Sequence, residues 1–119
     1  MMRPSYLGGW AVIYELRIYT VHPGRMRALQ ARFRDHTCAL FERHGMTNVG
    51  YWVNAIGGRS DELWYILGYD DLAGRQAAWA AFAADPEWHR VAAESEADGP
   101  IVHHLENRML APTDFSPLT

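Results

Sequence analysis

The chain has no lysine, because all 11 of its basic residues are arginines. This absence excludes catalysis through a lysine Schiff base, including pyridoxal-phosphate chemistry on an internal lysine. Its one cysteine, Cys38, has no partner for a disulfide within the chain, which favours a reducing, cytoplasmic setting. No apolar run approaches the roughly 18 residues that a membrane-spanning helix needs, so we expect no membrane partner.

Sequence motifs for nucleotides and nucleic acids are also missing. No nucleophile elbow, P-loop or dinucleotide fingerprint occurs, and the Gly-Gly pairs at 8–9 and 57–58 are isolated. Arginines gather between residues 25 and 43, yet acidic residues are mixed among them and the formal net charge is -3. A mixed, net negative surface of this kind argues against nucleic-acid binding.

The histidines do not form a metal-binding pattern. His103 and His104 are neighbours in a region that alternates like a strand, so their rings should point to opposite faces. His36 and His44 are eight residues apart, with no carboxylate between them at ligand spacing. We therefore expect neither a metal nor any other cofactor.

The length of 119 residues and the 49% content of hydrophobic residues predict one folded domain. We expect a flexible leader over residues 1–10, the domain over 11–112 and a tail over 113–119. Periodicity and turn signals predict, in order, a strand at 12–21, a helix at 25–43, strands at 47–56 and 62–69, helices at 72–84 and 87–97, and a strand at 101–110.

This order is that of a ferredoxin-like βαββαβ sandwich of the α+β class. The helices of such a fold cover one face of the sheet, and a solvated second face should not carry many aromatic residues. Here Trp52 or Tyr51, Trp64 or Tyr65, and Tyr19 must include residues on that face. We therefore expect a homodimer in which two sheets face each other and enclose a barrel-like space.

The first strand carries the most informative pattern in the chain. Glu15, Arg17 and Tyr19 alternate with the apolar side chains of Tyr14, Leu16 and Ile18. Successive strand residues point to opposite faces, so we expect the apolar set under the helices and the polar set in the space between the sheets.

The last strand carries a second charged set, with His104, Glu106 and Arg108 spaced two residues apart. If the two strands are antiparallel neighbours, these residues are expected to face Glu15 and Arg17 in a cross-strand ladder. In a catalytic interpretation Arg17 binds an oxyanion or carboxylate, while Glu15 or His104 moves a proton. The alternative is an ion-pair network that only supports a dimer interior.

The predicted function is a metal- and nucleotide-independent enzyme, an isomerase, dehydratase or cofactor-independent oxygenase, acting on an aromatic or polyketide-like carbonyl compound. The candidate catalytic residues are Glu15, Arg17, Tyr19 and His104, and the candidate binding residues are Trp52, Asn54, Tyr65, His89 and Arg108. Trp52 is expected to form a flat wall, and His89 to close one end of the cavity. A non-catalytic binding or assembly protein is an alternative, and haem binding through His89 or His104 is another.

Several separated blocks resemble the NIPSNAP family. They are the segments at 14–20, 23–24, 41–45, 49–52, 69–72 with Arg75, 85–88 and 106–110. The resemblance implies a dimeric α+β barrel, a superfamily that includes cofactor-independent monooxygenases, muconolactone-type isomerases and haem-dependent enzymes. Tyr65 departs from the family pattern, in which a histidine often stands on the third strand.

Overall fold

The structure is a computed structural model and describes residues 12–118. The leader predicted for residues 1–10 lies outside this range. The elements are β1 (Ile13–Val21), α1 (Met26–Arg32), η1 (Phe33–Thr37), α2 (Cys38–Arg43), β2 (Thr47–Val53), β3 (Glu62–Tyr69), α3 (Leu72–Ala84), α4 (Pro86–Ser95) and β4 (Val102–Leu110). Their order is the predicted one.

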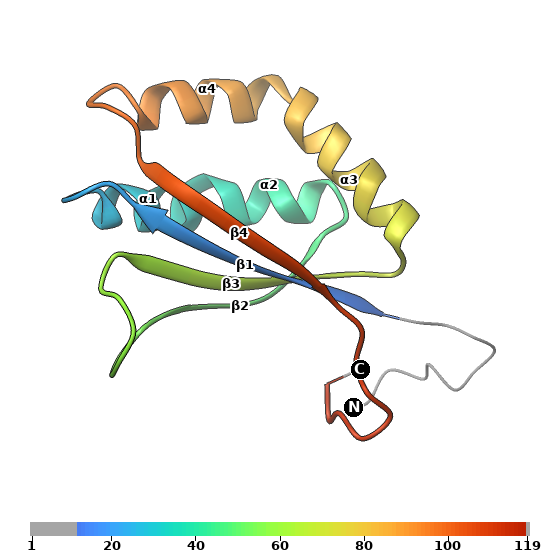
Figure 1. The fold of residues 1–119 in the computed structure, drawn as a ribbon. Coiled ribbons are helices and arrows are strands. Elements are labelled where there is room, and N and C mark those ends of the chain that lie inside the picture. Colours follow the sequence, from blue (N-terminus) through green and yellow to red (C-terminus); the bar gives the residue numbers. More distant parts are fainter. Residues whose placement is uncertain (1–11, 119) are drawn as a thin grey trace.

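The strands form one antiparallel sheet in the order β2-β3-β1-β4. All helices lie on one face of this sheet, with α1, η1 and α2 forming one rod and α3 and α4 forming a second, bent rod (Figure 1). This arrangement confirms the ferredoxin-like α+β fold. Within residues 12–118, no helix combines the length and the apolar character needed to cross a membrane.

The first helical rod contains an irregularity that the sequence did not predict. Its central five residues, Phe33–Thr37, form a π-helical turn between α1 and α2. The Thr37 hydroxyl donates a hydrogen bond of 3.1 Å to the carbonyl oxygen of Arg32, five residues earlier. Such turns inside α-helices are rare and frequently lie at functional sites.

Two aspartates cap the N-termini of the helices of the second rod. Asp71 accepts a hydrogen bond from the backbone N–H of Gly74, which caps α3. Asp85 accepts one from the N–H of Glu87 and precedes the proline at the start of α4. A side-chain acceptor at this position satisfies one of the open N–H groups of a helix. Asp71 thus fixes the start of the second rod, and Asp85 lies at its bend between α3 and α4.

The hydrophobic core lies between the sheet and the helices. Leu63, Tyr65, Leu67 and Tyr69 of β3 point toward the helices and are at most 4% exposed. Trp64 and Ile66, which alternate with them, are only half-buried. The protomer therefore buries one face of β3 fully and the other face only in part.

The polar set of β1 lies on the helix-covered face, and its predicted placement away from the helices is wrong. Arg17 pairs with Tyr65 and Glu15 with Leu67 in the β1–β3 register. Residues directly opposite each other share a face, so Glu15 and Arg17 lie on the same helix-covered face as Leu67 and Tyr65. The sequence rule that apolar residues lie inside fails for β1 because partners from other elements satisfy its buried charges.

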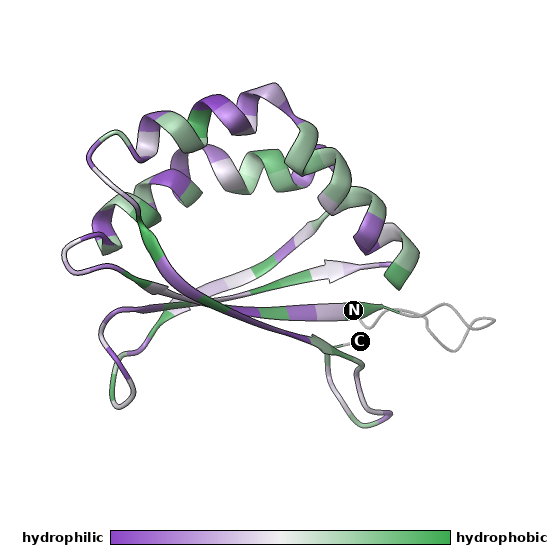
Figure 2. Ribbon diagram, turned by 45° about the horizontal axis from the view of Figure 1, so that its top comes forward, coloured by the Kyte–Doolittle hydropathy of each residue, from purple (hydrophilic) through white to green (hydrophobic). Residues whose placement is uncertain are grey.

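The opposite face of the sheet is open in the protomer. Trp52 lies opposite Trp64 on this face and is 51% exposed. The edge strand β4 is exposed from His103 to Leu110, and hydrophilic residues occupy its middle part (Figure 2). Leu105 and Met109, on the helix-covered face of β4, are 44% and 39% exposed. Large apolar side chains thus remain uncovered on β2 and β4.

Candidate functional site

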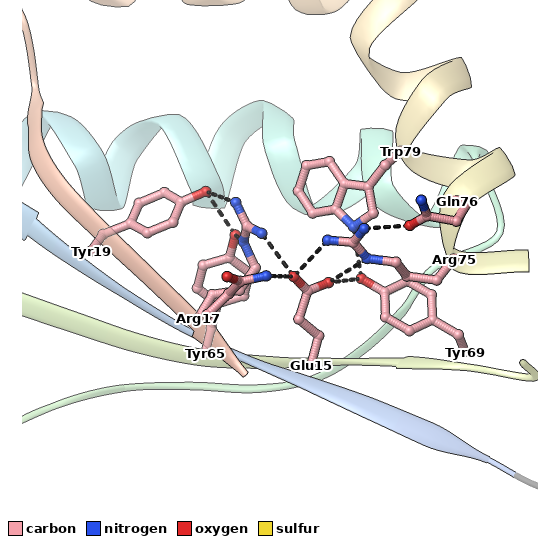
Figure 3. Close-up of polar contacts among 9 residues, drawn as sticks. Glu15, Arg17, Tyr19, Tyr65, Tyr69, Arg75, Gln76 and Trp79 are labelled. Carbon is pink, nitrogen blue, oxygen red and sulfur yellow. Dashed lines mark hydrogen bonds and ion pairs between the residues drawn. The ribbon is translucent and has the colours of Figure 1, made fainter. Parts of the chain in front are cut away.

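The carboxylate of Glu15 is fully buried and lies at the centre of a polar network (Figure 3). Arg17, on the same strand, donates a hydrogen bond of 2.9 Å to it, and the Tyr69 hydroxyl donates one of 2.7 Å. Arg75 of α3 donates two, of 3.2 and 2.9 Å, and the Asn107 amide of β4 donates one of 2.8 Å. Groups from four elements therefore meet at one carboxylate.

Arg17 links this carboxylate to two tyrosines. Its Nε donates a hydrogen bond of 2.7 Å to the Tyr65 hydroxyl, and its Nη2 donates one of 3.1 Å to the Tyr19 hydroxyl. The Trp79 ring lies against the guanidinium, with its centroid 4.4 Å from Cζ. The position and orientation of the Arg17 charge are therefore fixed by hydrogen bonds and by an aromatic face.

The network holds its charged groups in their ionised forms. Burial by itself raises the pKa of Glu15, but hydrogen bonds from Arg75, Tyr69 and Asn107, together with the Arg17 charge, lower it to about 2. Burial works against the charge of Arg17, yet Tyr19, Tyr65 and Glu15 raise its pKa above the usual range. Burial raises the pKa of Tyr65 well above its ordinary value, and Tyr19 adds to this effect. Tyr65 is therefore a neutral hydrogen-bond donor.

Tyr19 is where the network reaches a cavity. Its hydroxyl oxygen accepts hydrogen bonds from Arg17, at 3.1 Å, and from the Tyr65 hydroxyl, at 2.8 Å. Its own hydroxyl hydrogen has no acceptor among residues 12–118. Since both described hydrogen bonds are accepted by the Tyr19 oxygen, that hydrogen is available to a ligand.

The cavity lies between β1 and the helices and has a volume of about 210 Å³. Aromatic side chains form most of its wall, and Arg32 is the one charged residue among the described residues that line it. The full lining is Tyr19, Arg32, Phe33, Thr37, Phe41, Trp79, Phe82, Ala83 and Trp88. A concave apolar space with a few directed polar groups is what a small-molecule site requires.

The charges of the network that contacts Tyr19 do not sum to zero. Two guanidinium groups, of Arg17 and Arg75, surround the single carboxylate of Glu15. The cluster therefore carries one net positive charge beside the Tyr19 hydroxyl. Fixed positive charge and hydrogen-bond donors aimed at one point stabilise negative charge that develops there.

The predicted ladder between β1 and β4 is not formed. In the register of these strands His104 lies opposite Thr20, Glu106 opposite Ile18 and Arg108 opposite Leu16. His104, Glu106 and Arg108 therefore lie on the open face, away from Glu15 and Arg17. Asn107, which the prediction passed over, is the β4 residue that lies opposite Arg17.

The remaining predicted site residues are divided between the network and the periphery. Tyr65 is in the network, while Trp52 lies on the open face. Asn54 donates hydrogen bonds to the Arg59 carbonyl and to Glu62, and so supports the β2–β3 turn. The Nε2 atom of His89 lies 2.6 Å from the Ala83 carbonyl oxygen, and its neighbour Trp88 lines the cavity instead. No group of three potential metal ligands occurs within the described residues.

Four important residues were not among the candidates: Arg32, Arg75, Trp79 and Asn107. Arg32 lies between the core residues Leu29 and Phe33, and an arginine on an apolar helix face is a detectable signal. Asn107 stands between Leu105 and Met109, so the apolar alternation of β4 marks its face. Nothing in the spacing alone connects Arg75 to Glu15, since they are 60 residues apart.

Fold and site together define a ferredoxin-like α+β protein with a small cavity under its helices. The sequence model of the NIPSNAP family matches residues 14–117, and the chain belongs to this family. Human NipSnap homolog 3A is 34% identical over 77 residues, which is 65% of this chain and 30% of that protein. Mouse NipSnap homolog 3B is 32% identical over 75 residues, 63% of this chain and 30% of its own length. The match thus spans less than a third of these relatives.

Solved structures agree with this assignment. A NIPSNAP family protein of unknown function from Agrobacterium tumefaciens superposes with a TM-score of 0.80 at 28% identity, covering 92% of this chain and 95% of the other. SnoaB, a cofactor-independent oxygenase from Streptomyces nogalater, gives a TM-score of 0.59 at 18% identity, covering 90% and 98% of the two chains. The second similarity shows a shared fold alone.

The low pKa of Glu15 predicts an acid-dependent stability. Between its ordinary pKa of 4.5 and its folded value of about 2, the unfolded chain binds a proton that the folded chain does not. Stability from Glu15 is therefore present above pH 4.5 and is lost as the pH falls toward 2, by on the order of 3 kcal/mol. Urea unfolding of wild type and Glu15→Gln across this range should show the two curves converging at low pH.

Glu94→Gln is the matched control, because the Glu94 side chain is 64% exposed on α4. Its unfolding free energy should follow that of the wild type at every pH. Parallel curves for wild type and Glu15→Gln would contradict the assignment of a buried, ionised Glu15.

Proposed function

We propose that this chain is a small-molecule enzyme that promotes proton transfer beside a carbonyl group, as an isomerase, a dehydratase or a cofactor-independent oxygenase does. The observation that carries this proposal is Tyr19, which lines an aromatic cavity and whose hydroxyl oxygen accepts hydrogen bonds from Arg17 and Tyr65. The Tyr19 hydrogen is available to the carbonyl oxygen of a bound compound. The ligand is an aromatic carbonyl compound.

Loss of a proton from carbon beside a carbonyl places negative charge on the carbonyl oxygen. Tyr19 donates a hydrogen bond to that oxygen, and the Arg17 guanidinium stabilises the charge through the Tyr19 hydroxyl. The acceptor of the carbon proton in this proposal is water, and the lining residue Ala83 is exposed to solvent. Glu15 does not line the cavity, so its role is to position and balance Arg17.

The cavity volume limits the size of the ligand. An apolar protein cavity of about 150 Å³ holds benzene, and sites for drug-sized ligands begin near 300 Å³. The 210 Å³ of this cavity lies between these values. It suits one aromatic ring with small substituents better than a multi-ring polyketide.

A non-catalytic binding protein is a second candidate, favoured by one observation. The carboxylate of Glu15 and the guanidinium of Arg17 have their partners inside the protein, as a purely structural network also requires. Such a protein binds the same ligands and exchanges no protons. For haem, the described geometry gives less support, because neither His89 nor His104 lines the cavity.

Tyr19→Phe separates catalysis from binding. The probe is 4-hydroxyacetophenone in D₂O, whose acetyl hydrogens exchange with solvent when the ketone forms its enolate. The wild type should accelerate this exchange, followed by NMR, and Tyr19→Phe should reduce the acceleration by about 10²-fold, the usual range for a lost proton donor.

Tyr51→Phe is the control for this experiment. The Tyr51 hydroxyl bonds to Asn48 at 2.6 Å and does not line the cavity, so exchange should stay at the wild-type rate. Binding is followed in parallel by quenching of tryptophan fluorescence, because Trp79 and Trp88 line the cavity. Binding without exchange in the wild type would support the binding protein instead.

We further propose that the chain forms a homodimer through the open face of the sheet. Trp52 on the edge strand β2 and Trp64 on β3 lie side by side on this face, and both are at least partly exposed. Neighbouring exposed tryptophans favour burial against another surface. A second copy of the chain offers the same aromatic face, as a two-fold interface requires. Light scattering at micromolar concentration should therefore give twice the mass of one chain.

Two neighbouring residues of β2 make a matched pair for testing this interface. Trp52 and Val53 are 51% and 50% exposed but lie on opposite faces of the sheet. Trp52→Glu should shift the protein toward monomers, since it places a charge inside the interface, while Val53→Glu should remain dimeric. A wild type that stays monomeric, or equal effects of both changes, would contradict the proposed interface.

A further inference from the structure

The π-helical turn in the first helical rod changes which of its residues line the cavity. Residues five apart are separated by about 140° around a regular α-helix, so Arg32 and Thr37 would not share a face. Here Arg32, Phe33 and Thr37 all line the same cavity, and Thr37 bonds back to the Arg32 carbonyl. The extra residue of the turn thus brings Arg32 to the cavity.

Arg32 is buried but weakly paired. Its side chain is 7% exposed, and its hydrogen bonds are long, at 3.3 Å to Ser95 and 3.4 Å to Glu96. Both leave from Nη1, and Nε and Nη2 have no acceptor within the described part of the chain. By contrast, each of the three side-chain nitrogens of Arg17 donates a hydrogen bond of 2.7 to 3.1 Å.

The surroundings of Arg32 favour an anion on the cavity side. No carboxylate is among the described residues that line the cavity, whereas Asp35 and Glu94 line the outer groove that Arg32 also borders. Trp88 lies against the guanidinium, 5.3 Å from Cζ to the ring centroid, and holds it at the cavity wall. A guanidinium with free donors in an apolar site matches a carboxylate, which it can bind through two hydrogen bonds.

We propose that the cavity selects a one-ring aromatic carboxylate, with Arg32 binding the carboxylate and Tyr19 the second polar group of the ring. This inference rests on the proposed function, because it assumes that the cavity is the ligand site. It adds a substrate class: the ligand is anionic, and its charge is recognised by a residue outside the Glu15 network. Arg32 is thus a specificity-determining residue.

Two isosteric probes test this selectivity in the full chain. 4-Hydroxybenzoate carries a carboxylate, and 4-hydroxybenzamide has a neutral group of the same shape. Isothermal titration calorimetry should show at least tenfold tighter binding of the benzoate by the wild type. Arg32→Met should remove this preference while the benzamide still binds as before.

Arg90→Met is the matched control, because Arg90 is an exposed residue of α4 that pairs with Glu94 and does not line the cavity. It removes one positive charge and should leave the preference intact. If circular dichroism shows that Arg32→Met does not fold, Arg32→Lys serves instead: it keeps the charge, loses the two-bond geometry and should lower the preference several-fold.

The outcomes distinguish the two proposals. Equal binding of both probes, unchanged by substitution of Arg32, would overturn the carboxylate proposal and leave the cavity as a ligand site. Preference for the benzoate that survives in the Arg32 variant would also overturn it. Failure of both probes, together with failure of 4-hydroxyacetophenone to bind, would remove the proposed function itself.

Discussion

The carboxylate of Glu15 in the core is the constraint on which the rest of the structure depends. It is fully buried, and an unpaired buried carboxylate costs several kcal/mol. Arg75 from α3, Tyr69 from β3 and Asn107 from β4 must all be in place to satisfy it. The charge therefore specifies the docking of α3 and the register of two strands. A slip of β1 by one residue would move every one of its side chains to the other face.

The same network prepares the cavity for chemistry. Glu15 fixes Arg17, Arg17 and Tyr65 hold the Tyr19 oxygen, and Tyr19 lines the aromatic cavity. Structural and catalytic interpretations of these residues are compatible, because a rigid network is also what holds a donor in one orientation. The π-helical turn adds Arg32 at another part of the wall. The polar groups of the cavity thus come from two independent sources.

Periodicity and turn residues predicted the order of the elements and most of their bounds, since these are local properties of the sequence. The prediction for β1 was wrong because the burial of its polar face depends on partners far away in the sequence. Both faces of β3 are largely apolar, so β3 does not decide which face of β1 is buried. The buried carboxylate of Glu15 is instead satisfied by partners such as Arg75, 60 residues away. A separate error, in the assumed register of β4 against β1, placed His104 and Arg108 in the site in place of Asn107. The family resemblance was confirmed, and it constrains the fold more than the chemistry.

The central claim is that the ligand site lies under the helices and not between the sheets of a dimer. A crystal structure of the chain soaked with 4-hydroxyacetophenone tests it most directly. The account predicts the ring against Phe33 and Trp79, with its carbonyl oxygen within hydrogen-bond distance of Tyr19. A compound bound on the open face, against Trp52 and Trp64, with the cavity under the helices unchanged, would contradict it.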